Sequence, residues 1–194
     1  MRAGAQAARH LIVALVMVGA PHAAHAQSAQ AWSLQGSVLL ASQEINGRLV
    51  TGLGGEGQLR YTPASLFSLG AGFQLTQHTS GTEQLILTAV FVEPRYTLDI
   101  GGDKLAPYLA GRLALVHESS DLIGAPGVSS NGTAIGGGAG ILFRATRTVN
   151  VDLGVAVVYQ SLGDATASNG ARVQFKAFAG YIAKLGVNVG FGGR

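Results

Sequence analysis

The sequence predicts an all-β protein, an eight-stranded antiparallel up-and-down transmembrane β-barrel. Two observations predict it. The chain contains eight runs in which apolar residues alternate with polar or small ones, and the connections between the runs alternate between shorter and longer segments. Alternation with a period of two is the pattern of strands with one apolar face. Short turns at one end and longer loops at the other are typical of barrels that cross a membrane.

Residues 1–26 are interpreted as a secretory signal peptide, with cleavage expected before Gln27. Arg2 and Arg9 precede the apolar core LIVALVMVGA, and the segment closes with the small residues AHA. That core has ten residues, about half of the ~20 that a membrane-spanning helix needs. The sequence therefore predicts two parts, a signal peptide over 1–26 and one barrel domain over 27–194.

Composition argues against several classes of function. Removing Arg2 and Arg9 from the 13 basic residues leaves 11 against 10 acidic ones, so basicity does not indicate a nucleic-acid partner. The chain has no cysteine, and only His78 and His117 remain after cleavage. Neither a disulfide framework nor a zinc site is expected, and no cofactor is predicted.

The strands are delimited by turn signals such as SQEING, TPA, HTSGT and DIGGD. Eight is an even number, as bacterial barrels require, and most runs exceed the ~9–11 tilted residues that cross a bilayer. The excess is expected to form a rim above the membrane. The predicted strands cover residues 32–40, 49–61, 67–76, 82–98, 106–117, 133–146, 149–160 and 172–191.

Aromatic residues fall near the ends of the apolar faces, where a girdle at the membrane interface would place them. The alternative fold is a soluble lipocalin-like barrel, in which the apolar face would line a ligand cavity. That fold needs a charged exterior, whereas the polar face here is largely glycine, serine and alanine. The predicted interface aromatics are Trp32, Tyr61, Tyr96, Phe143, Tyr159 and Phe191.

Four segments carry a resemblance to a known family. They are VEPRYTL, APYLAGRLAL, GAGILFRATRTVNVDLGVAVVY and the aromatic-ended AKLGVNVGF. With them, nearly all of residues 27–194 resembles the eight-stranded outer-membrane β-barrel domains of the OmpA-like and OmpX-like kind.

The resemblance implies a location in the outer membrane, surrounded by its lipid and lipopolysaccharide. It also implies insertion by the barrel assembly machinery, which in this family reads a last strand ending in an aromatic residue. Here Phe191 is followed by Gly192 to Arg194, a departure from that pattern.

Strand parity directs ten charged residues toward the interior. An eight-stranded barrel is just wide enough for side chains to fill it, so a plug of ion pairs is expected; the alternative is a small anion-favouring pore, because seven of the ten are basic. The predicted lumen cluster is Glu56, Arg60, Glu93, Arg95, Arg112, Arg144, Asp152, Arg172, Lys176 and Lys184.

Two further hypotheses concern the loop side. His117 and Ser119 share a face and resemble the histidine base and serine nucleophile of outer-membrane lipid A deacylases. The match departs from that family at Ser120, Val116 and Leu115, so the protein is predicted not to be an enzyme.

The other hypothesis places function in a surface loop over 118–132, ESSDLIGAPGVSSNG, which carries apolar residues among polar ones. Loops on a rigid scaffold often carry binding, so a host or surface ligand is a possible partner. The predicted function is structural or surface interaction.

Overall fold

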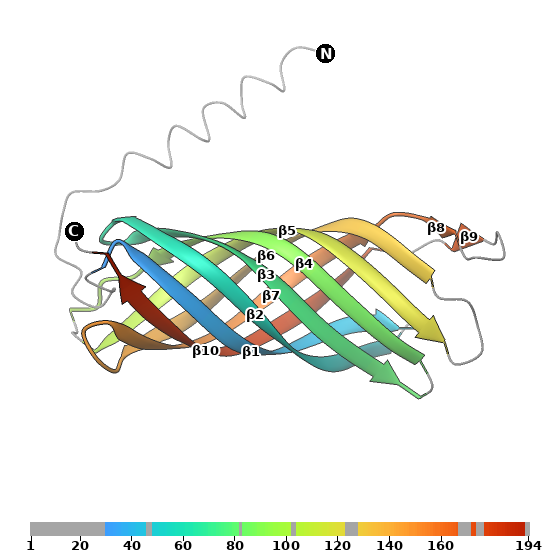
Figure 1. Ribbon diagram of the computed structural model, residues 1–194, viewed down its shortest axis with the longest axis horizontal. Coiled ribbons are helices and arrows are strands. Elements are labelled where there is room, and N and C mark those ends of the chain that lie inside the picture. Colours follow the sequence, from blue (N-terminus) through green and yellow to red (C-terminus); the bar gives the residue numbers. More distant parts are fainter. Residues whose placement is uncertain are drawn as a thin grey trace, which may run out of the picture.

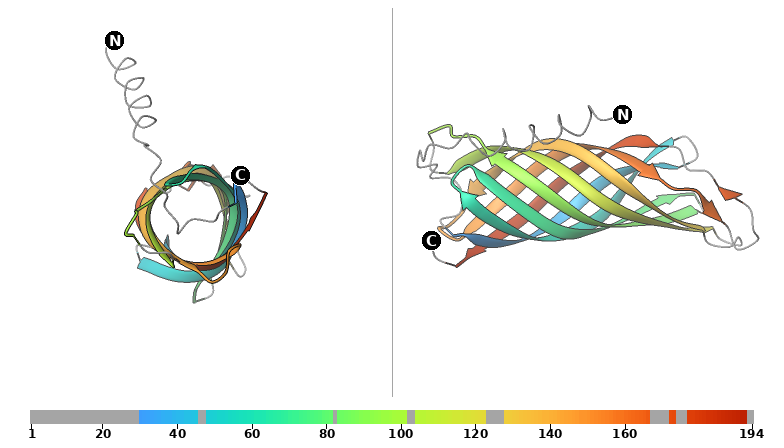
Figure 2. Two further views of the ribbon diagram at one scale, coloured as in Figure 1. Left: turned by 90° about the vertical axis from the view of Figure 1, so that its left-hand side faces the viewer. Right: turned by 90° about the horizontal axis from the view of Figure 1, so that it is seen from above.

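Eight long strands close into a single antiparallel barrel. The computed structural model describes residues 30–45, 48–81, 83–101, 104–122, 128–166, 172–173 and 177–192. Around the barrel the order is β1-β10-β7-β6-β5-β4-β3-β2, and a view along its axis shows the closed ring (Figure 2). The strands are β1 (Trp32–Ile45), β2 (Arg48–Ala64), β3 (Phe67–Ser80), β4 (Glu83–Thr97), β5 (Leu105–Leu122), β6 (Val128–Arg144), β7 (Val149–Leu162) and β10 (Phe178–Phe191).

The first and last long strands complete the barrel. β1 pairs with β10 from Trp32↔Phe191 to Ala41↔Ile182. Closure leaves no free edge whose backbone groups would need another partner. The predicted fold class is confirmed. We call the end with Trp32 and Phe191 the turn end, and the opposite end, where β1 meets β2 and β5 meets β6, the loop end (Figure 1).

The strands extend further toward the loop end than the sequence predicts. β5 and β6 remain paired up to Ser120↔Val128, so most of the predicted 118–132 loop is strand. Likewise β3 and β4 pair up to Ser80↔Glu83, although HTSGT predicts a turn from His78. Residue types that favour turns do not end the ladder here, because the two strands are held together by backbone hydrogen bonds.

The eighth strand begins later than predicted. The expected run started at Arg172, whereas β10 begins at Phe178. Arg172–Val173 instead form the short strand β9, which pairs with β8 (Ala165–Thr166) as a separate two-stranded sheet. This small sheet lies beyond the barrel at the loop end (Figure 1).

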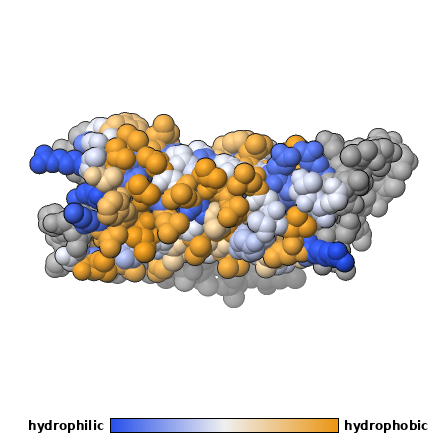
Figure 3. All heavy atoms as spheres, turned by 90° about the horizontal axis from the view of Figure 1, so that it is seen from below, coloured by the Kyte–Doolittle hydropathy of each residue, from blue (hydrophilic) through white to orange (hydrophobic). Residues whose placement is uncertain are grey.

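The two faces of the wall differ as the alternation predicts. Along β7 and β10 the exposed positions are almost all apolar, and the buried ones are mostly polar or small. Figure 3 shows this exterior: apolar side chains cover most of the wall, and strongly polar ones gather toward the two ends. No helix in the described part of the chain is long and apolar enough to cross a membrane.

Pro94 interrupts one ladder without shifting its register. β4 pairs with β5 at Val92↔Leu113 and again at Arg95↔Ala110, with no pairing between. Proline cannot donate a backbone hydrogen bond, so the gap falls where that donor is missing. Because the register is unchanged, Glu93 and Arg95 on either side of Pro94 both still point into the lumen, where they are buried.

Candidate functional site in the barrel lumen

Glu93 is the centre of a buried ion network. Its Oε1 atom lies 2.8 Å from Arg60 Nη2 and 2.9 Å from Arg95 Nη2, and its Oε2 atom lies 2.8 Å from Arg112 Nη2. Lys184 Nζ donates to both carboxylate oxygens at 3.2 Å. One carboxylate from β4 therefore receives hydrogen bonds from β2, β4, β5 and β10.

Glu56 extends the network toward β2. Its Oε2 atom lies 2.7 Å from Arg112 Nη2, and its Oε1 atom lies 3.5 Å from Lys184 Nζ. Arg112 also donates through Nη1 to Gln74 at 2.9 Å. The guanidinium and the ammonium thus bridge two carboxylates, which spreads their charge over several strands.

Asp152 anchors the network on β7 and is buried. It accepts from Tyr108 Oη at 2.7 Å, Gln35 Nε2 at 2.8 Å and Arg95 Nη2 at 3.0 Å. The Arg95 guanidinium lies 3.9 Å above the Tyr108 ring, and the Arg112 guanidinium lies 3.9 Å above the ring of Phe91. Aromatic faces attract such cations, so stacking supplements the ion pairs.

Glycines on the strands beside them make room for these large side chains. A Cβ atom added at Gly140 or Gly154 would overlap the hydroxyl of Tyr108, and one added at Gly70 would overlap Gln58. Packing also explains the inward glycines of the GGGAG segment, because Gly140 faces Tyr108 and a Cβ atom at Gly136 or Gly138 would overlap backbone carbonyl oxygens of β7.

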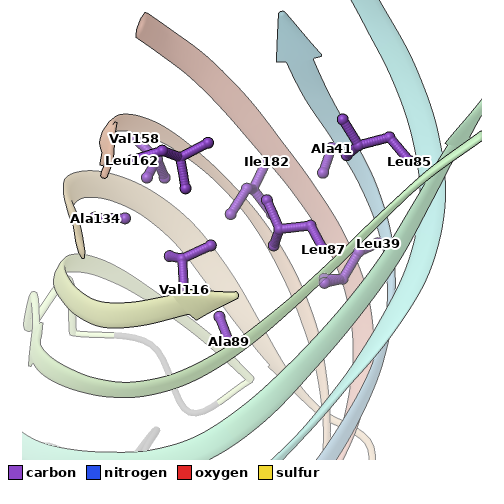
Figure 4. Packing of buried hydrophobic residues seen from close by; sticks show 10 residues of the cluster. All are labelled: Leu39, Ala41, Leu85, Leu87, Ala89, Val116, Ala134, Val158, Leu162 and Ile182. Atoms are coloured by element: carbon purple, nitrogen blue, oxygen red, sulfur yellow. The ribbon is translucent and has the colours of Figure 1, made fainter. Parts of the chain in front are cut away.

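An apolar layer lies between the ion network and the loop end. Figure 4 shows these side chains pointing toward one another inside the barrel. They are buried and form one cluster. A layer of this kind has no groups to replace the hydration of an ion. Its members are Leu39, Ala41, Leu85, Leu87, Ala89, Val116, Ala134, Val158, Leu162 and Ile182.

Polar side chains also lie in the lumen beside this apolar layer and on its loop-end side. Glu118 is buried and accepts a hydrogen bond from Gln43 Nε2. His78 is buried as well, and its Nε2 atom lies 3.1 Å from the carbonyl oxygen of Ala41. Glu118 belongs to the segment predicted as a surface loop; the structure instead places its side chain inside the barrel.

Seven of the ten predicted lumen residues meet in the ion network. They are Glu56, Arg60, Glu93, Arg95, Arg112, Asp152 and Lys184. Arg144 is half-buried at the turn end of β6. Arg172 lies in β9, away from the barrel wall, which corrects its predicted lumen position. Lys176 is outside the described residues, as are residues 1–26, the predicted signal peptide.

Sequence reasoning missed the neutral members of the network. Tyr108, Gln35, Gln58 and Gln74 each bond to a charged partner. The alternation of the strands places all four on the inward face, and this pattern could have identified them as lumen residues. The predicted lumen cluster contains only charged side chains.

The predicted interface aromatics gather mainly at the turn end. Trp32 pairs across strands with Tyr61 and Phe191, and the Trp32 and Tyr61 ring centroids are 4.7 Å apart. Tyr96 pairs with Phe67, which the prediction omitted, and Phe143 lies at the same end opposite Leu105. All six predicted residues are exposed.

Tyr159 is the exception, because it lies toward the loop end of β7. Tyr181, which the prediction also omitted, occupies the same side of the barrel on β10, and its hydroxyl lies 2.6 Å from Thr51 Oγ1. Exposed tyrosines thus lie at the loop-side limit of the apolar exterior as well.

His117 and Ser119 share the outward face of β5, as predicted. His117 Nδ1 lies 2.9 Å from Asn131 Oδ1 on the neighbouring strand β6. Thr88 Oγ1 donates to the backbone carbonyl of His117 at 3.3 Å. The histidine is therefore engaged across the hairpin. Within the described residues no group of three or more His, Cys, Asp or Glu side chains could hold a metal ion.

Comparison with solved structures identifies the fold of the chain. No protein-family model and no curated protein matches the chain. Neisserial surface protein A matches with a TM-score of 0.68 and 18% identity, covering 83% of this chain and 97% of that one. The chain has the eight-stranded outer-membrane barrel fold.

Two more solved outer-membrane barrels support this. Ail, the attachment invasion locus protein of Yersinia pestis, matches with a TM-score of 0.54 and 15% identity over 81% of this chain and 96% of that one. The N-terminal β-barrel domain of Pseudomonas aeruginosa OprF matches with a TM-score of 0.50 and 15% identity over 82% and 97%. Such identities establish the fold alone.

Proposed function

We propose that the protein is an integral outer-membrane barrel with a structural or surface-interaction role, built on a lumen that side chains fill. The observation that carries the proposal is the contrast between its two faces. Polar and charged side chains are buried inside, and large apolar side chains are exposed outside. A soluble protein rarely exposes apolar surface on this scale, whereas lipid would cover it. Lipid and lipopolysaccharide are then its surroundings, and the barrel assembly machinery its partner during insertion.

The membrane location has a direct test. Expression with the native N-terminus should place the chain in the outer-membrane fraction, and the folded barrel should migrate faster on a gel before boiling than after. Recovery from the periplasmic extract without a heat-dependent shift would contradict the proposal. That result would favour the soluble alternative.

The surface role rests on the extension of β5 and β6 beyond the apolar exterior. β5 and β6 remain paired up to Ser120↔Val128 at the loop end, and residues 123–127, which connect them, lie outside the described part of the chain. Two of the structures with this fold are named for the cell surface or for attachment, which supports a similar role here. The partner would be a host or surface ligand that meets this hairpin.

The test should spare the buried side chains of the hairpin. Removing all of 118–132 would delete Glu118, which is buried, along with paired strand residues. Replacing only residues 123–127 with a glycine-serine segment of equal length avoids this. Whole-cell binding to host cells or matrix should fall while heat-modifiable migration stays normal. The matched control replaces residues 98–103 at the turn end in the same way, and equal binding by both variants would remove the hairpin from the proposal.

A further inference from the structure

A small cavity lies inside the barrel at the level of the apolar layer. Its volume is about 30 Å³. Its walls include Leu87, Val116 and Val158 from that layer. Polar side chains also border the cavity, so its lining is partly apolar and partly polar.

Three of these polar side chains carry an atom without a hydrogen-bond partner among the described residues. The atoms are Thr76 Oγ1, His78 Nδ1 and Gln160 Nε2. All three side chains are buried and line the cavity. Buried polar atoms in folded proteins are nearly always paired with protein or ordered water, so this cluster calls for a ligand.

The chemistry of the three atoms identifies that ligand. His78 Nε2 lies 3.1 Å from the Ala41 carbonyl oxygen, so the nitrogen donates there and the neutral ring leaves Nδ1 as an acceptor. Gln160 Nε2 is a donor, and the Thr76 hydroxyl can do either. The matching molecule both donates and accepts and carries no charge. Because a water occupies about 10–15 Å³ measured in this way, the cavity has room for about two.

We propose that this cavity is a hydration site, and that its waters complete a polar path along β3 through the apolar layer. Gln74, Thr76 and His78 are successive inward positions of β3, and all three line the cavity. At one end Gln74 bonds to Arg112 of the ion network. At the other, Gln43 also borders the cavity and bonds to Glu118.

The path gives the ion network a route for exchanging protons with solvent at the loop end. Bound water passes protons through hydrogen bonds, while the apolar walls leave no space for a hydrated ion. The inference concerns the lumen alone and does not depend on which partner the hairpin binds.

Nuclear magnetic resonance of the folded full-length barrel in phospholipid nanodiscs tests the proposal. Bound water should give rotating-frame cross-peaks to the Gln160 side-chain amide protons. Thr76→Val keeps the side-chain shape but removes the hydroxyl, so these cross-peaks should be lost and exchange of the Arg112 Nη1 protons, which face Gln74, with solvent should slow. Thr133→Val makes the same change on the outer face and should leave both signals unchanged.

The opposite results would overturn the proposal. A wild-type barrel without water cross-peaks at Gln160 has a dry cavity, whatever the variants do. Arg112 exchange that Thr76→Val leaves unaltered would show that the network gains its protons by another route. If Thr76→Val does not fold, judged by heat-modifiable migration, the wild-type cross-peaks and the rate of Arg112 proton exchange in Gln160→Leu decide the matter.

Discussion

Glu93 illustrates at the residue scale how charge is accommodated inside a narrow barrel. A lone buried carboxylate would be strongly unfavourable, and ion pairing offsets the cost of desolvation only when the geometry and hydrogen bonding are good. Here four cations surround it, each within 3.2 Å. The cations in turn need the carboxylate, because burial leaves them few other partners.

Replacing Glu93 with glutamine should therefore destabilise the barrel. The change leaves Arg60, Arg95, Arg112 and Lys184 around a neutral amide, and breaking buried pairs of this kind costs about 3–5 kcal/mol. Urea unfolding in lipid vesicles measures the loss. Glu44→Gln makes the same change at an exposed site and should shift stability by less than about 0.5 kcal/mol; equal effects would mean that the network contributes nothing.

Gly140 and Gly57 provide a matched pair for testing how tightly the lumen is filled. An alanine Cβ at Gly140 would collide with Tyr108, whereas one at Gly57 would meet no atom within 4 Å. Gly140→Ala should cost about 1–3 kcal/mol through overpacking. Gly57→Ala should be neutral or stabilise the strand by up to about 1 kcal/mol. Unfolding midpoints in urea compare the two, and similar costs would show that the lumen has spare room.

At the scale of the strand, depth along the wall decides what an outward position tolerates. Leu185 lies in the middle of β10, opposite Val38 and Leu153. Leu49 lies at the loop end of β2, opposite Glu44. Their exposed fractions are nearly equal, 57% and 55%. Exposure alone therefore does not distinguish them, but a bilayer would.

Arginine at these two positions should separate a lipid-facing wall from a water-facing one. In lipid, Leu185→Arg should cost about 2–4 kcal/mol and Leu49→Arg about 0–1 kcal/mol, because the penalty falls from the bilayer centre toward the interface. The free energy of unfolding from phospholipid vesicles is the measurement. If the two variants lose the same stability, the apolar face does not meet lipid.

At the scale of the whole molecule, two layers fill the lumen in series. The ion network occupies the part toward the turn end, and the apolar cluster follows it toward the loop end. An open pore would need a continuous hydrated path wide enough for an ion. The cavity of about 30 Å³ that borders both layers is far smaller than that.

The purified barrel should therefore be silent in planar lipid bilayers. No steady conductance is expected at moderate voltage, because the apolar layer offers no ligands to an ion. Insertion should be verified in the same preparation by heat-modifiable migration, so that silence reflects a closed lumen. A steady, anion-selective conductance would establish the pore alternative instead.

The sequence by itself determined the strand count, the parity and the composition of both faces. A period of two is a local property, since each side chain points opposite to its neighbour whatever the partners of the strand are. Parity therefore placed Glu93, Arg95 and Arg112 inside before any pairing was known. Parity could not show where the strands end. Beyond the apolar exterior the strands continue through backbone hydrogen bonds, which do not depend on the polarity of the side chains.

Only the tertiary structure decided which inward residues meet. LILTAVF is apolar on both faces, so the sequence did not reveal that Leu87 and Ala89 join an apolar layer with residues from the other strands. Nor did it show that Arg95 on β4 donates a hydrogen bond to Asp152 on β7, a residue 57 positions away in the sequence. These contacts depend on register and closure, which set the height of each residue in the barrel, and no local pattern encodes that height.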